Sequence, residues 1–535
     1  MLISLLSQMS LYGPESPDWL QGRHDFKKTG KSAWKCNNPA IPDRIWSDRT
    51  SSDCFGVSGN NVVNVVMDVN GDGINEVLGA GNYTCPFIGS GIGIRLRVYP
   101  ANSSSYLWQL YWNNSASNTD ANVDAFMAGA ITNSGRRLFS VDYRQGFFGS
   151  PRRYFTAISL SGGGGSVIYQ RQDCSGDNVC SSGLTIADVN NDGCPEIYRG
   201  VNNSAVAVNG CSNNYIEIWN YNLGNTVGIP VIGKIDDNPD WDIAFPVAPN
   251  IINVRRASDG AFKFSYTLPS NYPYLLDYDF YSNVLTAYDI DGDGKDELIV
   301  RTSSQLLALK YNGSSFNVLW SSNYSTSSAI AIGPILNGNA LGIAVNSSGS
   351  LLIINASNGS LVAQTSSGYC GAPTITDING DGIWDALISE CSCGNPHAFS
   401  RTNGFSSPIW NAGGCASEPP ISSDLIVAKY YLNPDNTGKM VIVEGDFSCD
   451  TNVWMCDAAE FTTPVELKEL VSYDKNYLYI YNYKGPFEVY NIEGKVIYKG
   501  VYEKPMRLEL KDGVFILKTQ NKIHKFISKK EVKKW

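Results

Sequence analysis

Residues 68–76 read Asp-Val-Asn-Gly-Asp-Gly-Ile-Asn-Glu, and three later stretches repeat the pattern. The copies are Asp-Val-Asn-Asn-Asp-Gly-Cys-Pro-Glu at 188–196, Asp-Ile-Asp-Gly-Asp-Gly-Lys-Asp-Glu at 289–297 and Asp-Ile-Asn-Gly-Asp-Gly-Ile-Trp-Asp at 377–385. All four read D-x-[DN]-x-D-G-x-x-[DE], and each lies between short runs rich in β-branched residues. The sequence therefore predicts a repeated unit of strand, nine-residue loop and strand.

Degenerate copies of this unit fall between and after the four loops, at 129–141, 235–243, 333–345 and 430–443. A further strand, polar turn and strand follow in several modules, and the last strand often ends in Trp, as at Trp108 and Trp320. Modules of about four strands are typical of β-propeller blades. We therefore expect an all-β fold with a seven- or eight-bladed propeller, eight favoured, between about residues 45 and 460.

The acidic loops predict metal binding because clustered carboxylates repel one another unless a cation lies among them. Side chains at positions 1, 3, 5 and 9 and the carbonyl at position 7 are expected to converge, and an all-oxygen shell suits Ca²⁺. The alternative is a set of Asx turns without metal. About four structural Ca²⁺ ions are expected, with these ligands: Asp68, Asn70, Asp72, Ile74, Glu76, Asp188, Asn190, Asp192, Cys194, Glu196, Asp289, Asp291, Asp293, Lys295, Glu297, Asp377, Asn379, Asp381, Ile383 and Asp385.

These loops resemble the FG-GAP or VCBS-type repeat of integrin-α-like β-propellers. The resemblance implies that each loop binds Ca²⁺ and stabilises a blade. Only half of the modules keep the acids, so the resemblance does not extend metal binding to the others. The stretch 19–30, Trp-Leu-Gln-Gly-Arg-His-Asp-Phe-Lys-Lys-Thr-Gly, is similar to a lead-in seen before many secreted propellers.

The chain changes character near residue 460. The whole chain carries a net charge of −10, yet residues 464–535 hold fourteen Lys and one Arg against nine acids, and they lack Cys. The acidic balance of the rest argues against nucleic acid as a partner. The expected organisation is a signal-peptide remnant or disordered lead at 1–17, a propeller at 18–460 and a Lys-rich β-sandwich at 464–535.

Residues 466–530 read as a small all-β unit, which includes a hairpin at 487–498 with an Ile-Glu-Gly-Lys turn. This tail resembles the C-terminal sorting domain of type IX secretion cargo, which implies sorting or anchoring. An unrelated β-sandwich for anchoring or assembly is the alternative. The sequence has no run of about 18 apolar residues, so no transmembrane helix is expected.

Thirteen cysteines without a metal-cluster spacing indicate an oxidising, extracellular setting. Close spacing suggests the disulfides Cys174–Cys180 and Cys449–Cys456. Because the number of cysteines is odd, at least one thiol is free or paired with another chain. Sequons support the same setting weakly. The possible glycosylation sites are Asn82, Asn102, Asn113, Asn202, Asn312, Asn323, Asn346, Asn355 and Asn358.

Three functions remain open. The favoured one is a secreted or cell-surface binding or adhesion module for glycans or proteins. The second is a structural subunit of an extracellular filament or surface layer, assembling through the C-terminal domain. The third is a polysaccharide lyase of the rhamnogalacturonan-lyase type. His24 and His397 carry no catalytic signature, and no nucleophile motif is present, so an enzyme is the least favoured class.

Overall fold

The computed structural model describes residues in two groups of ranges. In the first part of the chain these are 27–29, 31–32, 34–36, 43–49, 62–83, 92–115, 119–146, 152–175, 180–273, 275, 283–391, 395–412, 425–432, 438–445 and 450–460. In the last part they are 471–474, 477–480, 485–491, 496–502, 506–509, 513–519 and 523–528. The chain divides into two compact units, Met1–Glu460 and Phe461–Trp535.

Strands dominate both units. Among the described residues the only helical turns are the short 3₁₀ segments η3 (Asn337–Asn339) and η4 (Arg401–Asn403). No helix in this part of the chain is long and apolar enough to span a membrane. The all-β prediction is confirmed.

The first unit contains eight antiparallel sheets, which we number as blades in chain order. Blades 1 to 4 are β3–β6 (Val62–Met67, Glu76–Tyr83, Ile92–Pro100, Trp108–Ser115), β7–β10 (Thr119–Thr132, Gly135–Gly146, Arg152–Ser161, Gly164–Ser175), β11–β14 (Ser181–Ala187, Glu196–Val201, Ser204–Asn209, Glu217–Asn222) and β15–β18 (Val231–Gly233, Asp242–Val247, Ile251–Arg256, Phe262–Thr267). Blades 5 to 7 are β19–β22 (Leu285–Tyr288, Glu297–Arg301, Leu306–Tyr311, Phe316–Ser322), β23–β26 (Ala331–Gly333, Gly342–Ser347, Ser350–Asn355, Leu361–Gln364) and β27–β30 (Tyr369–Thr376, Asp385–Glu390, Pro396–Ser400, Pro408–Asn411).

Blade 8 is assembled from both ends of the unit. Its first three strands are β31 (Ile426–Leu432), β32 (Gly438–Gly445) and β33 (Asp450–Glu460). The N-terminal strands β1 (Trp34–Cys36) and β2 (Asp43–Arg49) then pair antiparallel with β33. This closure joins segments that are very far apart in the sequence, and it was not predicted.

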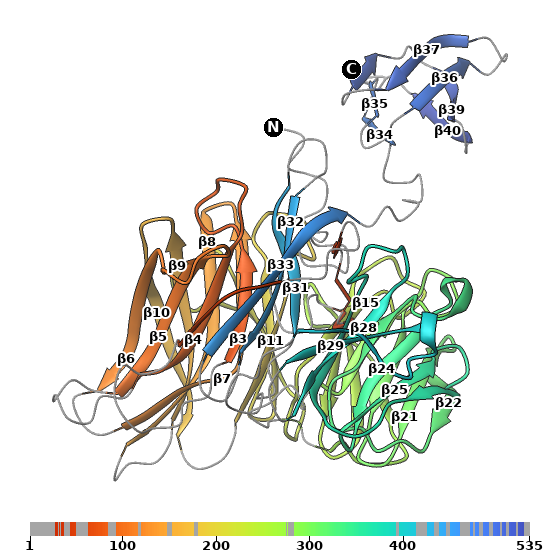
Figure 1. Ribbon diagram of the computed structural model, residues 1–535. Coiled ribbons are helices and arrows are strands. Elements are labelled where there is room, and N and C mark those ends of the chain that lie inside the picture. The colour runs from red at the N-terminus through yellow and green to blue at the C-terminus, as the bar shows by residue number, and fades with distance from the viewer. Residues whose placement is uncertain are drawn as a thin grey trace, which may run out of the picture. The chain divides into compact units, whose positions relative to one another are not determined.

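The blades form a ring because the first strand of one blade lies beside the first strand of the next. β7 contacts β3 and β11, and β31 contacts both β27 and β3, which completes the circle (Figure 1). The unit is therefore an eight-bladed β-propeller, and the favoured blade number is confirmed.

The hydrophobic core lies between neighbouring blades, where each sheet packs against the next. Trp residues on the fourth strands contribute to it, since Trp108, Trp219, Trp320 and Trp410 are all buried. The indole N–H of Trp219 donates to Ala257 O (3.1 Å), and that of Trp320 donates to Ala356 O (2.7 Å), each in the following blade. The recurring Trp of the sequence thus joins one blade to the next.

Residues 27–32 pass along the innermost strands of the ring. Backbone bonds join Lys27 O to Ala287 N (2.9 Å), Thr29 O to Ile332 N (2.9 Å) and Ser32 N to Ile375 O (2.8 Å). The Ser32 hydroxyl donates to Val427 O (2.8 Å), and Lys28 Nζ donates to Leu184 O (3.1 Å). The end of the predicted lead-in motif therefore bonds to blades 3, 5 and 6, and Ser32, just after it, bonds to blades 7 and 8.

The second unit has two antiparallel sheets, as expected for a small β-sandwich. One has the order β34-β35-β38 and the other β37-β36-β39-β40. The predicted hairpin is formed by β36 and β37. The strands are β34 (Val471–Asp474), β35 (Tyr477–Ile480), β36 (Gly485–Asn491), β37 (Val496–Tyr502), β38 (Met506–Glu509), β39 (Gly513–Thr519) and β40 (Ile523–Ser528).

We expect deletion of residues 1–49 to destabilise the propeller strongly. The deletion removes the strands that cover β33 and the segment that bonds to the inner strands, so backbone groups that were paired become exposed. Thermal unfolding followed by circular dichroism measures the effect. Deletion of 461–535, a separate compact unit, is the control and should leave the propeller transition in place. Equal melting temperatures for both deletions would contradict this account of closure.

Candidate functional site

The four acidic loops connect the first and second strands of blades 1, 3, 5 and 7, and we call them loops 1, 3, 5 and 7. In loop 1 the carboxylate of Asp68 accepts from the backbone N–H groups of Gly71 (2.5 Å) and Gly73 (3.0 Å). Asp289 in loop 5 and Asp377 in loop 7 bind the corresponding pairs of N–H groups. Asp188 does the same at Asp192 and Gly193. The first Asp therefore folds each loop around its own side chain.

Glycine at position 6 is required by the backbone. Gly73, Gly193, Gly294 and Gly382 have φ between +80° and +87°, a region that residues with a Cβ rarely adopt. The Asx-type bonds continue at position 5, where Asp72 accepts from Ile74 N (2.8 Å). A sharp turn at this glycine is therefore common to all four loops.

The acid at position 9 points back into its loop. One oxygen of Glu76 accepts from Val69 N (2.8 Å), and one oxygen of Asp385 accepts from Ile378 N (3.1 Å). Glu196 and Glu297 make the same bond. Burial raises the pKa of Glu76 to about 7, and that of Glu196 and Asp385 to about 8. Burial is the main cause of these raised pKa values and neighbouring aspartates contribute to them, so each of these three loops holds a carboxylate that is costly to ionise.

The second oxygen of the position-9 acid faces the side chain at position 3. Asn70 Nδ2 lies 3.4 Å from Glu76 Oε1, and Asn190 Nδ2 lies 3.1 Å from Glu196 Oε1. An N–H donor of the chain thus points to the centre of both loops. The flipped amide would present Oδ1 there instead, and every group around that point would then be an oxygen.

A lysine supplies the central N–H group in loop 5. Lys310 Nζ contacts Asp291 Oδ2, Asp293 Oδ2 (2.7 Å) and Glu297 Oε1 (3.2 Å). Burial alone would lower the pKa of Lys310, but its hydrogen bonds to these three carboxylates raise it above the ordinary value. Loop 5 also brings ligand atoms of Asp289, Asp291 and Glu297 within 4.8 Å of one another.

A second lysine, on β18, contacts acids of the degenerate connection of blade 4 in the same way. Lys263 Nζ contacts Asp236 Oδ2 (2.8 Å) and Asp242 Oδ1. Asp242 Oδ2 accepts from the N–H groups of Ile235 (3.1 Å) and Asp236 (3.0 Å), as the position-9 acids do elsewhere. This connection therefore keeps the acidic centre although it is two residues shorter.

Position 8 links a loop to the preceding blade. In loop 1 the backbone N–H of Asn75 donates to Tyr430 O (2.7 Å), and its side chain donates to Lys429 O (2.9 Å), both on β31. In loop 5 Asp296 N donates to Lys234 O (2.7 Å), and Lys234 N donates back to Asp296 Oδ2 (2.7 Å). Ordering of these loops therefore also fixes contacts between blades.

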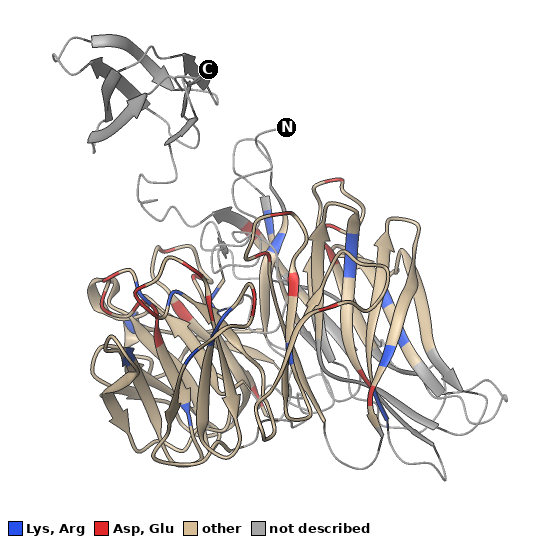
Figure 2. Cartoon of the chain, turned by 180° about the vertical axis from the view of Figure 1, so that it is seen from behind, with Lys and Arg blue, Asp and Glu red and all other residues tan. Residues whose placement is uncertain are grey.

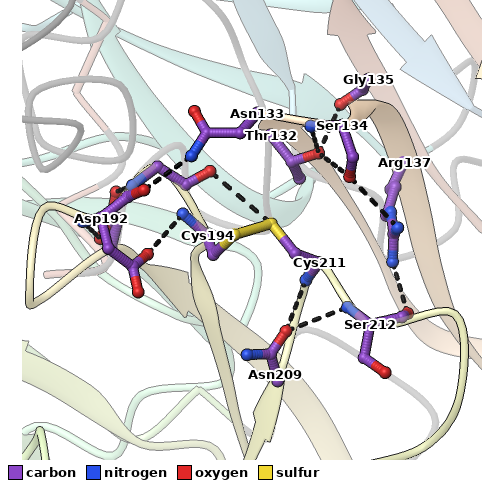
Figure 3. Close-up of a disulfide and its surroundings, with 12 residues drawn as sticks. Thr132, Asn133, Ser134, Gly135, Arg137, Asp192, Cys194, Asn209, Cys211 and Ser212 are labelled. Carbon is purple, nitrogen blue, oxygen red and sulfur yellow. Dashed lines mark hydrogen bonds between the residues drawn. A yellow bond between two sulfur atoms is a disulfide. The ribbon is translucent and has the colours of Figure 1, made fainter.

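The turn of blade 2 has lost its acids and instead contacts both neighbouring loops. Arg136 Nε donates to Asp68 O in loop 1 (2.8 Å), and its Nη2 lies 3.6 Å from Asp68 Oδ2. Asn133 donates to Gly193 O (3.0 Å) and through its side chain to Asp192 O (2.7 Å) in loop 3, as Figure 3 shows. A Cβ on Gly193 would lie 2.2 Å from Asn133, so this approach needs a glycine as well.

A disulfide joins Cys194 in loop 3 to Cys211 in the turn that follows β13 (Figure 3). Cys194 occupies position 7, where the prediction concerned only its backbone carbonyl. A further disulfide joins Cys370 to Cys391 in blade 7. The sequence reasoning missed both pairs, although two cysteines on either side of a predicted hairpin were a usable signal.

The predicted disulfides have different outcomes. Cys174 and Cys180 form the disulfide that their spacing suggested. Cys456 is disulfide-bonded, and Cys449 lies outside the described residues. The pairing of Cys449 with Cys456 therefore stays a prediction.

The predicted glycosylation sites differ in accessibility. Asn346 is buried, and its amide donates to Tyr369 O (2.8 Å), so it is not accessible in the folded protein. Asn355 is partly buried. The side chains of Asn82 and Asn113 lie outside the described residues. The exposed sites are Asn102, Asn202, Asn312, Asn323 and Asn358.

Of the three histidines, only His397 has a described side chain. His397 is buried on β29 beside Tyr369, its Nε2 lies 3.7 Å from Glu390, and burial lowers its pKa, so it is uncharged at neutral pH. His24 and the side chain of His524 lie outside the described residues.

The donor set of loops 1, 3 and 7 fits a hard divalent cation. Each loop offers carboxylates at positions 1, 5 and 9, an amide oxygen at position 3 and a backbone carbonyl at position 7, all in a single turn. Figure 2 shows acidic residues gathered in connections along one rim of the propeller. Among the described residues, ligand atoms of three acids lie within 4.8 Å of one another in loop 5, and in loops 1 and 3 the position-9 acid contacts the amide at position 3. Metal binding by the four sets of residues stays a prediction, and loop 5 differs by its lysine.

Comparison with known proteins supports the fold. No family model matches the chain, and no curated protein matches its sequence. A europium-containing methanol dehydrogenase has a TM-score of 0.51 at 10% identity, over 84% of this chain and 98% of that chain. BamB from Moraxella catarrhalis has a TM-score of 0.42 at 12% identity, over 78% and 98%. A rhamnogalacturonan lyase from Bacillus licheniformis has a TM-score of 0.41 at 16% identity, over 68% and 69%. At these identities the likeness concerns the fold alone, and the chain is an eight-bladed β-propeller with acidic loops in half of its blades.

The buried acids predict a pH dependence for the metal-free protein. A carboxyl group with a raised pKa binds its proton more tightly in the folded chain, so stability is lost as the pH rises from the unfolded to the folded pKa. For Glu196 that interval runs from 4.5 to about 8. In EDTA the free energy of unfolding should therefore fall across this interval, and Glu196→Gln should make the fall smaller. Urea titrations at several pH values measure it, and a stability that rises with pH over this interval would contradict the prediction.

Proposed function

We propose that this chain is a secreted or cell-surface, calcium-stabilised β-propeller that acts as a binding or adhesion module for a glycan or a protein. The observation that carries the proposal is the shared fold of loops 1, 3 and 7, in which the first Asp and the acid at position 9 both accept backbone N–H groups of the loop. Loops 1 and 3 are also hydrogen-bonded to neighbouring blades. A Ca²⁺ ion in such a loop would hold Asp68, Asp72 and Glu76 together and offset their repulsion. The FG-GAP-like repeat is part of this proposal.

An extracellular setting is supported by the disulfides Cys174–Cys180, Cys194–Cys211 and Cys370–Cys391. Disulfides of this kind persist in oxidising compartments, where millimolar Ca²⁺ also fills weak sites. The exposed sequons agree with that setting.

A binding role is supported by apolar and aromatic side chains exposed on the outer strands. Tyr221 on β14 and Phe262 on β18 are 39% and 58% exposed, and the guanidinium of Arg255 lies 4.5 Å from the first ring and 5.8 Å from the second. Exposed aromatic rings beside a cation suit stacking on sugars or packing against a protein. The Trp side chains on the fourth strands are instead core, so they do not supply this surface.

A structural role in a filament or surface layer is the second candidate. It is favoured by the separate C-terminal unit, whose sheets end in the strands β34, β38, β37 and β40. Such edge strands can accept a strand from a neighbouring molecule. The resemblance of this unit to a secretion sorting domain gives it an alternative task, which is attachment to the cell surface.

We expect calcium to be retained by the purified protein and to stabilise it. Removal of Ca²⁺ with EDTA should lower the melting temperature by several degrees, and added Ca²⁺ should restore it, because binding to the folded state alone shifts the unfolding equilibrium. Asp377→Ala should reduce the calcium content, whereas Asp259→Ala, a change at an exposed residue outside the loops, should not. An unchanged melt together with no calcium by mass analysis would refute the metal assignment.

Binding and assembly are separated by two experiments on the full chain. A glycan array probed with and without EDTA should give calcium-dependent binding, which Tyr221→Ala combined with Phe262→Ala should weaken about tenfold or more. Negative-stain microscopy of native material should show single particles. Filaments or sheets in that material, with an empty array, would favour the structural role instead.

A further inference from the structure

We propose that Lys310 is the resident cation of loop 5, so that this loop does not take a divalent ion in the native protein, and that Lys263 plays the same part in blade 4. The proposal refines the calcium stabilisation proposed above and rests on it. The propeller would then use two kinds of cation: divalent ions in loops 1, 3 and 7, and lysine ammonium groups in blades 4 and 5.

The contacts of Lys310 involve the groups that an ion would need. Its ammonium group binds carboxylate oxygens at positions 3, 5 and 9 of loop 5, which are Asp291, Asp293 and Glu297. The aliphatic stem runs from β21, which is fixed by its pairing with β20 and β22. A divalent ion could enter only if the ammonium left all three carboxylates. The side chains of Asp291 and Asp293 are 46% and 37% exposed, whereas that of Glu297 is 1% exposed, so the pair with Glu297 is the contact that opposes the exchange most strongly.

The corresponding positions in the other loops carry no positive charge. The residue paired with the position-9 acid is Pro100 in blade 1, Asn209 in blade 3 and Ser400 in blade 7. In blade 5, Leu298 pairs with Leu309, so Glu297 faces Lys310 in the same register. Since the four loops share their fold, this one position distinguishes loop 5 from the others.

Loop 5 also has the largest number of acids, with Asp289, Asp291, Asp293, Asp296 and Glu297. Sequence alone therefore makes it the most convincing calcium site. Of the two other acids, Asp296 binds Lys27 Nζ through its Oδ1 (2.6 Å), whereas Asp289 accepts the backbone N–H groups of Gly292 and Gly294. Lys295, at position 7, binds Asp237 in the connection of blade 4. Blades 4 and 5 are thus joined by ion pairs between protein groups.

Blade 4 provides an independent case of the same arrangement. Lys263 lies on β18, the fourth strand of its blade, whereas Lys310 lies on β21, the third strand of its blade. Lys263 nevertheless contacts Asp242, which in this connection corresponds to the position-9 acid. Asp242 and Lys263 are both largely buried, with side-chain exposures of 0% and 11%. A buried carboxylate needs a compensating cation. Here the chain supplies it through Lys263.

The test counts calcium ions on the full chain by native mass spectrometry and by metal analysis after dialysis against Ca²⁺. The wild type should bind one ion fewer than Lys310→Met, which keeps the aliphatic stem but removes the charge. Lys439→Met is the matched control, since Lys439 makes an exposed ion pair with Asp457 outside the loops, and its count should equal that of the wild type. The reciprocal variant Pro100→Lys should lose one ion from loop 1.

Equal, non-zero calcium counts for the wild type and Lys310→Met would overturn the inference and leave the calcium proposal standing. No calcium in either protein would overturn both. Should Lys310→Met fail to fold, the variants Asp293→Asn and Asp381→Asn, each made in a chain that keeps Lys310, still test the inference by their calcium counts. Loss of an ion only from Asp381→Asn supports Lys310 as the resident cation of loop 5, and loss from Asp293→Asn as well overturns it.

Discussion

Repulsion between carboxylates in a single tight turn is the constraint on which the rest of this structure depends. Each acidic loop folds around its first Asp and then buries a further acid at position 9, whose pKa rises as a result, to about 8 in Glu196. Such a group is stable as a carboxylate only beside positive charge. In blades 5 and 4 that positive charge is the ammonium group of Lys310 beside Glu297 and of Lys263 beside Asp242.

The loops matter beyond their own blades because they also contact their neighbours. Asn75 bonds to β31 in blade 8, Asp296 bonds to Lys234 in blade 4, and Asn133 of blade 2 bonds to loop 3. A propeller has no central core, so its rigidity comes from packing and bonding between adjacent sheets. A cation that orders a loop therefore stabilises the contact between two blades, and a rigid ring is a suitable platform for a ligand on its outer strands.

Much of the fold could be predicted from the sequence, because strand, loop and strand recur with fixed residue types. The strands flanking the loops, the eight blades and the glycine turns follow from local chemistry. Closure of blade 8 by β1 and β2 could not be predicted, since it joins distant segments that carry no matching signal. The contact of Lys310 with loop 5 was also missed: its charge lies on β21, outside the loop-5 motif, and only strand pairing brings it to Glu297. Cys194 was correctly placed in a loop, but its disulfide partner was not identified.

The decisive observation is where cations bind in the four acidic loops. The most direct measurement is an anomalous difference map from crystals of the protein grown with calcium. The account predicts peaks surrounded by oxygen ligands in the loops that begin at Asp68, Asp188 and Asp377, and an ammonium group rather than a peak between Asp291 and Glu297. A map with only water in the first three loops would contradict it.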